Sequence, residues 1–583
     1  IAGQQPMCNE DQTIWLTYNG EIYNYQELNK QLKKKGHAFR SRTDTEVIIH
    51  AYEEWGYACL EHFAGMFAFA LWDSHKQSLW VVRDRIGIKP LFFACLNEAF
   101  VFGSEIKAIL EYPNFDRAVD FEALSYYLAL NYTPAPYTLF SGVRQLMPGE
   151  YLIIEANGKI QQRRYWDIEY HEDSSKPEKD LIEEFTFLLE SIVSQHLVSD
   201  VQFGAFLSGG LDSSSIVYWM SHLLKEPVKT FTIGFTENEF DESPYALQIA
   251  EFLNTSHHMK VIKPDATEIL PKLVWHAEEP TADSSMLAVY YLSREARQEV
   301  AWVLSGDGSD EILAGYETYQ AYYLLKLFQL LPKWFREICI ASLGKVLPVS
   351  DKKVGWDMKL ERFLRGVELP PEDAHATWRM IFGESDRKNL LAPIADNPLI
   401  GSDFVDLYRE CFSHSNATKP LNRMLYVDTR FYLPNDMLVK VDRMSMAHGL
   451  EARVPFLDHR LVEFAASLPT SLKIKWLHKK KYILKRSMKN RIPENIINRP
   501  KAGFNVPKSN WIKSDLKPFV TDVLSSQRIK DIGFLDTRFV ESVLQQHFNC
   551  KKDNSFQIWC LLNLSFWWQQ FQNRDKPYAS SAY

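Results

Sequence analysis

VQFGAFLSGGLDSSS, residues 201–215, is the stretch that decides the fold of most of this chain. Val201 to Leu207 is an apolar run with the length of a buried strand, and Ser213 to Glu226 repeats apolar residues along one helix face. The two glycines between them let the backbone approach a ligand closely, because no Cβ stands in the way. Free N–H groups and the positive dipole end of the first helical turn point at the same place. We therefore predict an anion site, with phosphate as its usual occupant.

The residues around the two glycines narrow this prediction. Asp212 puts a carboxylate beside the anion, as a magnesium–phosphate site requires. A Walker A loop is excluded, since GxxxxGK[ST] is absent. The alternative is a tight turn in which Ser208 only caps the helix. The longer pattern SGGLDSS favours the anion site.

Further strand–loop–helix units follow and predict a parallel α/β sheet with strands at 228–235, 257–262 and 301–304. Ligands of such sheets bind at the carboxyl ends of the strands. Ile233 and the loop SGDGSDE, residues 305–311, should therefore share one crevice with the SGG loop. Asp212 and Asp310 would then bring two carboxylates to one pyrophosphate-bound magnesium ion.

The first part of the chain alternates short strands and helices. We expect strands at 13–18, 63–72, 79–82, 90–93 and 99–102, with helices at 26–35 and from 43 or 44 onward. Asn19-Gly20 is expected to be a turn. Two helices and about five strands predict an α+β layered domain. Residues 165–178, with their Glu-Asp-Ser-Ser-Lys-Pro run, are typical of a linker.

Composition limits the function classes. With 46% apolar and 24% charged residues, the chain is an ordinary globular protein, and its net charge of −8 argues against a nucleic-acid surface. Since no run of about 18 apolar residues occurs, we expect no membrane span. Seven scattered cysteines without CxxC spacing suit a reducing cytosol and give no metal site. We expect a cytoplasmic protein.

Four motifs of the first part carry a resemblance: NGEIYNYQEL (19–28), SRTDTEV (41–47), FAGMFAFALWD (63–73) and RDRIGIKPL (83–91). They resemble the glutaminase domain of class II amidotransferases, which implies an N-terminal-nucleophile αββα sandwich over residues 1–165. The resemblance also implies that glutamine is held by Asn19, Gly20, Glu21 and Asp44. The alternative is that Asn-Gly is only a hairpin turn and Asp44 only a helix cap.

The nucleophile of that family is a cysteine at the N-terminus of the chain. This sequence starts at Ile1 and enters the family pattern partway along, so we expect the sandwich to be incomplete, without its first strand and its nucleophile. A longer natural N-terminus would restore the glutaminase activity and an ammonia passage between the domains. Cys8 is expected to be an ordinary half-buried cysteine.

A second set of motifs covers residues 200–515. These are SGGLDSS, FTIGF (231–235), EEPTADSS (278–285), SGDGSDEILAGY (305–316), GLEARVPFLD (449–458), KKYILKRSM (480–488) and RPKAGF (499–504). Together they are similar to the glutamine-hydrolysing asparagine synthetases. The resemblance implies a linker at 166–180, an ATP-pyrophosphatase domain with a helical C-terminal part at 181–572, and a tail at 573–583.

The same resemblance implies the site residues. ATP would be bound by Phe206, Ser208, Gly209, Gly210, Asp212, Ser213, Ile233, Ser305 and Gly306. Asp307 and Lys481 would be catalytic, and Asp212 and Asp310 would hold Mg²⁺. For Lys481 the alternative is a solvated basic face beside Lys479 and Lys480. For Arg453, Asp458 and Glu451, there are two alternatives: a buried ion-pair network, or contact with a ligand.

The implied reaction converts ATP, aspartate and glutamine or ammonia into AMP, diphosphate, asparagine and glutamate through β-aspartyl-AMP. A sibling ligase acting on another carboxylic acid, such as a β-lactam precursor or a sugar or peptide acid, is the close alternative, and a nucleotide-binding regulator is the distant one. Small molecules are the expected partners, with neither nucleic acid nor membrane. A homodimer stays an option.

Overall fold

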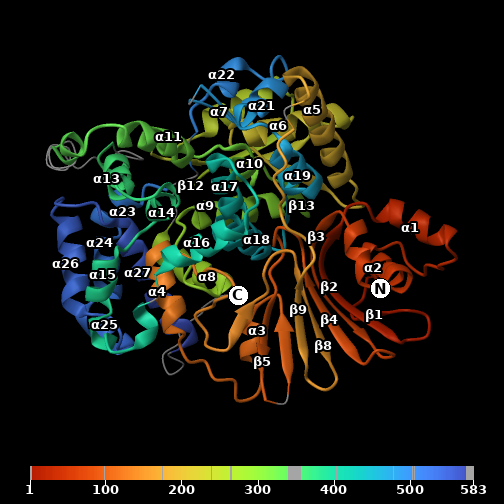
Figure 1. Ribbon diagram of the computed structural model, residues 1–583, viewed down its shortest axis with the longest axis horizontal. Coiled ribbons are helices and arrows are strands. Elements are labelled where there is room, and N and C mark those ends of the chain that lie inside the picture. The colour runs from red at the N-terminus through yellow and green to blue at the C-terminus, as the bar shows by residue number, and fades with distance from the viewer. Residues whose placement is uncertain are drawn as a thin grey trace.

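A computed structural model of the chain describes residues 3–97, 99–173, 175–237, 239–262, 265–338, 356–401, 403–476, 478–501, 503 and 506–572. Figure 1 shows a sheet-rich N-terminal part on one side and a larger, mainly helical part on the other. The expected tail at 573–583 lies outside the described residues. Among the helices that the structure describes, none has the length and apolar character needed to cross a membrane.

Two antiparallel sheets form the N-terminal part. The six-stranded sheet has the order β1-β2-β3-β4-β8-β9, and the three-stranded sheet has the order β6-β5-β7. The strands are β1 (Met7–Cys8), β2 (Ile14–Ile22), β3 (Gly65–Asp73), β4 (Ser78–Arg83), β5 (Phe92–Cys95), β6 (Phe100–Gly103), β7 (Val143–Gln145), β8 (Glu150–Glu155) and β9 (Ile160–Arg164). The predicted strands are therefore present, each with ends shifted by a few residues at most.

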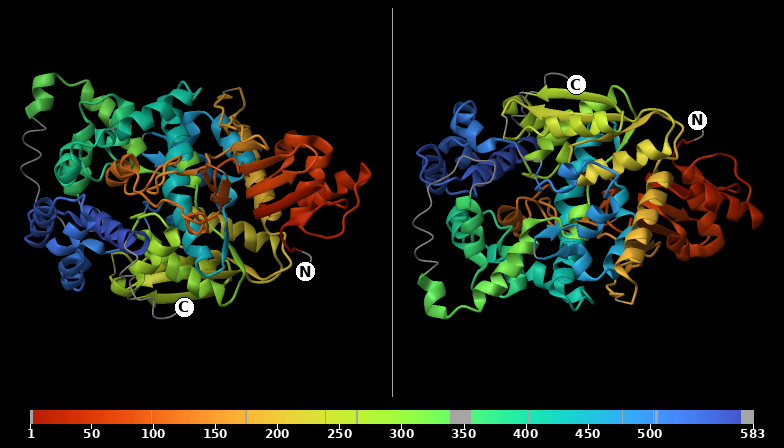
Figure 2. Two further views of the ribbon diagram at one scale, coloured as in Figure 1. Left: turned by 90° about the horizontal axis from the view of Figure 1, so that it is seen from below. Right: turned by 90° about the horizontal axis from the view of Figure 1, so that it is seen from above.

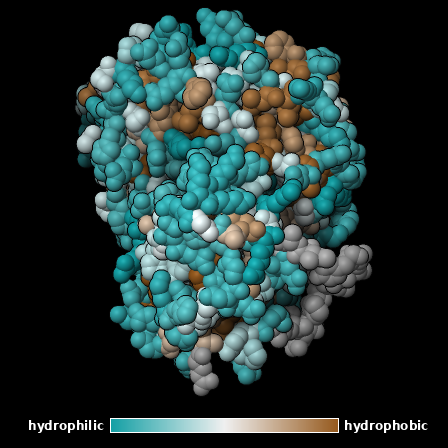
Figure 3. Space-filling view, turned by 90° about the vertical axis from the view of Figure 1, so that its right-hand side faces the viewer, coloured by the Kyte–Doolittle hydropathy of each residue, from teal (hydrophilic) through white to brown (hydrophobic). Residues whose placement is uncertain are grey.

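Helices cover the outer face of the larger sheet. Leu28 of α1 (Tyr25–Lys34) and Val47 of α2 (Asp44–Trp55) are buried in one apolar cluster with Phe69 and Trp80 of the sheet. A smaller cluster that includes Ala70 and residues near β5 and β7 fills the space between the two sheets. The layers follow the expected sandwich, and Figure 3, seen from the side of α1 and α2, shows that hydrophilic side chains cover most of this face.

Asn19 and Gly20 are not a turn. They lie inside β2, where Asn19 pairs with Ala68 and Gly20 with Phe67 of β3. A Cβ on Gly20 would lie 2.0 Å from the carbonyl oxygen of Met66. The glycine therefore permits a close approach between two strands, and the turn prediction is wrong because the dipeptide signal is the same for both uses.

The second part contains a five-stranded parallel sheet in the order β12-β11-β10-β13-β14. Its elements are α5 (Glu178–His196), β10 (Phe203–Phe206), α6 (Leu211–Leu223), β11 (Lys229–Phe235), α7 (Ser243–Phe252), β12 (Ser256–Ile262), α8 (Ala266–Ala277), α9 (Ser285–Arg297), β13 (Trp302–Leu304) and β14 (Glu451–Arg453). Four strands match the prediction. Strand β14 was not predicted, because three residues carry no periodic pattern.

Besides a two-stranded antiparallel sheet of β15 (Ile474–Lys475) and β16 (Lys479–Lys480), helices make up most of the remainder of the described chain. They are α3 (Ile106–Leu110), α4 (Phe121–Leu130), α10 (Ser309–Leu313), α11 (Glu317–Gln329), α13 (Trp356–Gly366), α14 (Pro371–Thr377), α15 (Glu384–Leu390), α16 (Phe404–His414), α17 (Pro420–Val427), α18 (Leu438–Met446), α19 (His459–Ser467), α20 (Thr470–Lys473), α21 (Tyr482–Ser487), α22 (Glu494–Ile497), α23 (Lys508–Lys513), α24 (Lys517–Val523), α25 (Ser526–Ile532), α26 (Thr537–Phe548) and α27 (Ser555–Phe571). A π-helical segment, Asp428–Met437, joins α17 to α18. The aromatic side chains of Phe566, Trp567 and Phe571 in α27 are buried in the core.

Buried polar contacts join the two parts. The ammonium of Lys89 lies 2.9 Å from the Asp442 carboxylate. The Arg430 guanidinium donates hydrogen bonds to the carbonyl oxygens of Arg85 and Pro148 at 3.1 and 3.0 Å. The views in Figure 2 show the N-terminal sheet packed against the central helices from both sides. The interface between the two parts therefore contains charged side chains whose ion-pair or hydrogen-bond partners lie in the other part.

Candidate active site

The SGG loop ends β10 and starts α6. Gly210 is the residue before the helix, and no side chain caps α6, so Ser208 is not a helix cap. Instead its backbone N–H donates to the Ser213 hydroxyl at 3.2 Å, and the two serine hydroxyls lie 3.1 Å apart. Gly209 has a φ of +65°, and a Cβ there would lie 2.4 Å from the backbone of Ala246 in α7. The loop thus leaves the first N–H groups of α6 without competing side chains.

The loop at 305–311 packs directly onto the SGG loop. A Cβ on Gly306 would lie 2.8 Å from the backbone nitrogen of Ser213. Next to it, the Ser305 hydroxyl donates to the Asp307 carboxylate at 2.5 Å. The expectation that the two loops share one crevice is confirmed, because residues of both loops line the same cavity.

Two carboxylates and two lysines meet where these loops touch. The Lys481 ammonium lies 2.7 Å from Asp212 Oδ1, 2.6 Å from Asp310 Oδ1 and 2.7 Å from the Ser309 hydroxyl. Lys501 Nζ lies 2.5 Å from Asp310 Oδ2 and 3.8 Å from Asp212 Oδ2. Lys481 is 5% exposed, so the alternative of a solvated basic face is wrong. We call these four residues the lysine–aspartate cluster.

The cluster perturbs its members strongly. Burial alone would raise the pKa of Asp310, but the charges of Lys481 and Lys501 outweigh it and hold the pKa far below the usual range. The pKa of Lys501 rises in turn, because the two carboxylates outweigh its burial. Burial and the neighbouring Asp310 raise the pKa of Glu311 to about 7. Such perturbed groups in a cleft are typical of functional sites.

A cavity of about 710 Å³ opens beside the cluster. Its volume lies in the usual range of about 300–1,000 Å³ for small-molecule sites. Of the residues expected to bind ATP, those on its wall are Phe206, Ser208, Asp212, Ser213, Ile233, Ser305 and Gly306, joined by Asp307 and Asp310. Gly210 and Lys481 line an adjoining pocket of about 90 Å³, whereas Gly209 packs on α7.

Several wall residues were missed by the sequence analysis. Lys501 stands in the RPKAGF motif, but a lone lysine gives no signal of its own. Lys440 lies 3.6 Å from the Asp283 carboxylate, and Arg379 stacks on the Tyr432 ring at 3.6 Å. Each comes from the helical part, far along the chain from the SGG loop. Only the tertiary fold brings them to the cavity.

The donor set of the cluster suits a magnesium ion. Carboxylate oxygens of Asp212 and Asp310 both contact the Lys481 ammonium group. The same two oxygens are therefore close enough to bind one metal ion. Magnesium prefers such oxygen ligands, usually one or two carboxylates together with substrate phosphates. These two residues are therefore the ones that would hold the ion.

The residues expected to bind glutamine lie together at the end of β2 and the start of α2. The Asn19 amide donates to the Ser104 hydroxyl at 3.0 Å, and Asp44 accepts from the Tyr18 hydroxyl at 2.7 Å and the Ile22 N–H at 2.9 Å. Burial, with Glu451 nearby, raises the pKa of Glu21 to about 8. Asp44 begins α2 without capping it through its side chain, because Thr43 holds the cap position.

A buried ion-pair network lies next to this group. Arg453 pairs with Glu451 at 2.6 Å and with Glu21 at 3.4 Å, and it also donates to the His196 carbonyl at 2.8 Å. Asp458 pairs with Arg460 at 2.7 Å. The network alternative for Arg453, Glu451 and Asp458 is confirmed. Cys8 in β1 is half-buried, as expected.

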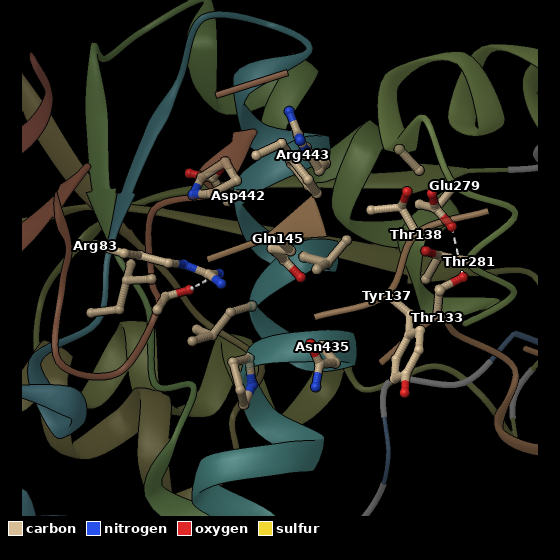
Figure 4. A pocket seen from close by; sticks show the side chains of 18 residues that line it. Arg83, Thr133, Tyr137, Thr138, Gln145, Glu279, Thr281, Asn435, Asp442 and Arg443 are labelled. Carbon is tan, nitrogen blue, oxygen red and sulfur yellow. Dashed lines mark hydrogen bonds between the residues drawn. The ribbon is translucent and has the colours of Figure 1, made fainter. Parts of the chain in front are cut away.

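A small cavity of about 30 Å³ lies between the two parts. Figure 4 shows Arg83 and Asp442 toward one side, Gln145 and Asn435 in the middle, and Glu279 at the other side. The Glu279 carboxylate accepts hydrogen bonds from the Thr133 hydroxyl at 2.6 Å and the Leu139 N–H at 3.0 Å. Burial raises its pKa to about 8. The cavity has room for about one or two molecules of the size of water.

Comparison with known proteins gives two family matches. The family described as asparagine synthase matches residues 184–569, and the glutamine amidotransferase domain matches residues 1–166. Among curated relatives, asparagine synthetase [glutamine-hydrolyzing] 1 of Bacillus subtilis is 34% identical over 97% of this chain and 87% of its own. A putative asparagine synthetase of Mycobacterium tuberculosis is also 34% identical, over 95% and 84%. Amidase chyE of Penicillium rubens is 28% identical over 94% and 85%.

Proposed function

Since this chain belongs to the asparagine synthase family, we propose that it is a glutamine-hydrolysing asparagine synthetase that uses ATP and Mg²⁺. Its class, an ATP-dependent carbon–nitrogen ligase with a glutamine amidotransferase domain, follows from the two family matches. The observation that carries the proposal is the lysine–aspartate cluster at the edge of the 710 Å³ cavity. It offers cations for phosphate groups and carboxylates for a metal ion.

ATP would lie with its phosphates on the first turn of α6. Helical N–H groups and the positive end of the dipole favour an anion there. Phe206 and Ile233 would border the base, since both are apolar residues of the cavity wall. Asp212 and Asp310 would hold Mg²⁺, which supplies charge neutralisation at the phosphate oxygens when bound.

The first step joins aspartate to the nucleotide. An oxygen of the β-carboxylate attacks the α-phosphorus of ATP, the bond to the β-phosphate breaks, and pyrophosphate leaves with the electron pair. Negative charge grows on the leaving group, so the ammonium groups of Lys481 and Lys501 would stabilise the transition state more than the ground state. The product is β-aspartyl-AMP.

The second step forms the amide. Ammonia attacks the activated carbonyl carbon, loses a proton and expels AMP. We assign Asp307 to this stage, because its carboxylate lies on the cavity wall and can accept a proton. The Ser305 hydroxyl, at 2.5 Å, would hold that carboxylate in place.

Ammonia would reach the second site from the glutamine site. Asn19, Gly20, Glu21 and Asp44 would bind glutamine in the N-terminal part, and the cavity of about 30 Å³ lies between the two parts. Its wall combines residues of both, among them Arg83 and Asp442 (Figure 4). This placement supports a passage for ammonia between the two sites.

A sibling ligase with a different acid is the second candidate. The Penicillium amidase, which aligns over 94% of this chain, supports it. Helices α11 to α17 also bring Lys359, Arg362 and Arg379 to the cavity wall, where they would select the acid. A regulator without chemistry is disfavoured by the complete lysine–aspartate cluster.

Pyrophosphate release distinguishes these candidates. The chain is incubated with Mg²⁺, ATP and ammonia, and with one carboxylic acid at a time from a panel that includes aspartate, glutamate and several peptide and sugar acids. We expect release with aspartate well above every other acid. Release with another acid alone would establish the sibling ligase, and no release with any acid would reject both.

A further inference from the structure

A group of metal-binding side chains lies in the N-terminal part, outside the site described above. His37 follows α1, whereas His50 and Glu53 lie one turn apart on α2. The Nδ1 atoms of the two histidines are 3.3 Å apart. Glu53 Oε2 lies 2.8 Å from His50 Nδ1 and 3.6 Å from His37 Nδ1. Three atoms with lone pairs therefore converge on one point.

The Nε2 atoms of the two histidines face carboxylates, which favours protonation of Nε2 and leaves the lone pair of Nδ1 free to bind a metal ion. His37 Nε2 lies 3.1 Å from Glu54 Oε2, and a carboxylate only accepts, so this nitrogen carries the proton. Carboxylates of Glu46 and Glu10 face His50 Nε2 at 3.6 and 3.9 Å. Histidines that bind metals typically donate their outer N–H to such a group.

The other oxygen of Glu53 is also occupied. The Asn9 amide donates a hydrogen bond to Glu53 Oε1 at 2.9 Å, and a second one to the Thr13 hydroxyl. Glu53 is thereby fixed with Oε2 toward the histidines. A single inward oxygen from the carboxylate and two inward ring nitrogens make a set of three ligand atoms.

The spacing of the three atoms matches a small tetrahedral ion. Zinc bonds to nitrogen and oxygen of about 2.0–2.1 Å place neighbouring ligand atoms of a tetrahedral site about 3.3 Å apart. The three observed separations are 2.8, 3.3 and 3.6 Å. Two imidazoles and one carboxylate suit zinc better than magnesium or calcium, which prefer oxygen ligands throughout.

We propose that His37, His50 and Glu53 bind a zinc ion. His50 is buried, but the side chains of His37 and Glu53 are 16% and 23% exposed, so a water molecule can supply the fourth ligand. The ion would tie the segment between the two helices to α2, the helix that begins with Asp44. It would act as a structural clamp of the N-terminal part, independent of the reaction proposed above.

Zinc binding by the untagged full chain tests this proposal. The protein is stripped with EDTA and dialysed against excess Mg²⁺, which occupies sites made of oxygen ligands. Zn²⁺ is then added, and the bound zinc is measured by mass spectrometry after gel filtration. We expect one zinc ion per chain. Co²⁺ in its place should give the intense visible bands of a tetrahedral site.

Variants identify the ligands. His37→Gln and Glu53→Gln should bind zinc at least about 10-fold more weakly. Glu54→Gln, which replaces the charged outer partner of His37 by a neutral amide and breaks the ion pair with Lys35, should bind it about 10- to 100-fold more weakly. His75→Gln, an exposed histidine of the same part, should bind as the wild type does. Circular dichroism of the metal-free variants checks that they fold. If His37→Gln does not fold, the zinc affinity of Glu54→Gln is the deciding measurement.

Two results would overturn the zinc site. One is a wild-type chain that takes up no zinc under these conditions. The other is a folded His37→Gln or Glu54→Gln variant that keeps the wild-type affinity and cobalt spectrum. Either result would mean that a proton shared between the two rings and Glu53 occupies the place of the ion.

Discussion

Asp212 and Asp310 share one ammonium group, that of Lys481, at 2.7 and 2.6 Å. At the scale of single residues, this arrangement predicts that neither carboxylate can be replaced. Asp212→Asn and Asp310→Asn should each lower the rate of pyrophosphate release by at least about 100-fold, because a charge next to the developing pyrophosphate is lost. The rate is measured with ammonia as nitrogen donor, and the exposed Asp180→Asn is the control. Wild-type rates in either variant would exclude that residue as a metal ligand.

Lys481 and its exposed neighbour Lys479 form a matched pair for a second prediction. Lys481→Ala should lower turnover about 100- to 1,000-fold and change the dissociation constant of ATP far less, because its cation acts mainly on charge that develops in the transition state. Lys479→Ala should have little effect on either. Turnover and ATP binding are measured separately, by pyrophosphate release and by calorimetry. Equal, small effects of the two substitutions would contradict a catalytic Lys481.

Sequence patterns identified some of these residues and not others. Asp212 and Asp310 could be predicted, because each follows the end of an expected parallel strand. The role of Lys481 could be predicted only from the family resemblance, because its lysine neighbours are equally consistent with a solvated basic face. Lys501 was missed: it pairs with an aspartate 191 positions away, and no local periodicity encodes such a contact.

At the scale of elements, two glycine loops touch where Gly306 meets the start of α6. A Cβ at Gly306 would lie 2.8 Å from Ser213 N, so Gly306→Ala should push the loops apart. Such overpacking costs about 1–3 kcal/mol. We expect about a 5- to 100-fold lower kcat/KM for ATP, measured by pyrophosphate release. Gly383→Ala is the control, since no atom lies closer than 3.7 Å to the added methyl group. An unchanged kcat/KM in Gly306→Ala would show that the loops tolerate separation.

Strands and helices with a clear hydrophobic periodicity could be predicted from the sequence. Features that depend on contact with a neighbouring strand could not. The helix expected at 26–35 is observed at Tyr25–Lys34, shifted by one residue. Asn19-Gly20 has the local signal of a turn, yet lies in a strand whose neighbour leaves no room for a Cβ. The strand β14 is three residues long and pairs with β13, which lies far earlier in the chain. The predicted domain limits at 165 and 181 stay predictions.

At the scale of the whole molecule, Glu279 joins the two parts through the Thr133 hydroxyl and the Leu139 N–H. Burial raises its pKa from 4.5 to about 8. The unfolded chain therefore releases this proton near pH 4.5, whereas the folded chain keeps it until about pH 8. Between these values the unfolded state binds fewer protons, so the wild type loses stability as the pH rises, by up to about 1.4 kcal/mol for each pH unit.

Glu279→Gln removes this dependence, and an amide oxygen in the place of Oε2 can still accept from the Thr133 hydroxyl and, at 3.2 Å, from the Leu139 N–H. Its melting temperature should be close to that of the wild type near pH 5 and should exceed it increasingly toward pH 8. Glu183→Gln, an exposed change on α5, is the control, and its difference from the wild type should stay constant. A constant difference for Glu279→Gln would mean that the carboxylate is already ionised at pH 5.

The transfer of a carboxylate oxygen to AMP tests the proposed reaction most directly. The chain is supplied with Mg²⁺, ATP, ammonia and aspartate whose β-carboxylate carries ¹⁸O, and the AMP is analysed by mass spectrometry. If the β-carboxylate attacks the α-phosphorus and ammonia then attacks the carbonyl carbon, each AMP molecule gains one labelled oxygen and the asparagine amide keeps the other. Unlabelled AMP formed together with asparagine, or ADP and labelled phosphate in place of AMP and pyrophosphate, would contradict an aspartyl adenylate at this site.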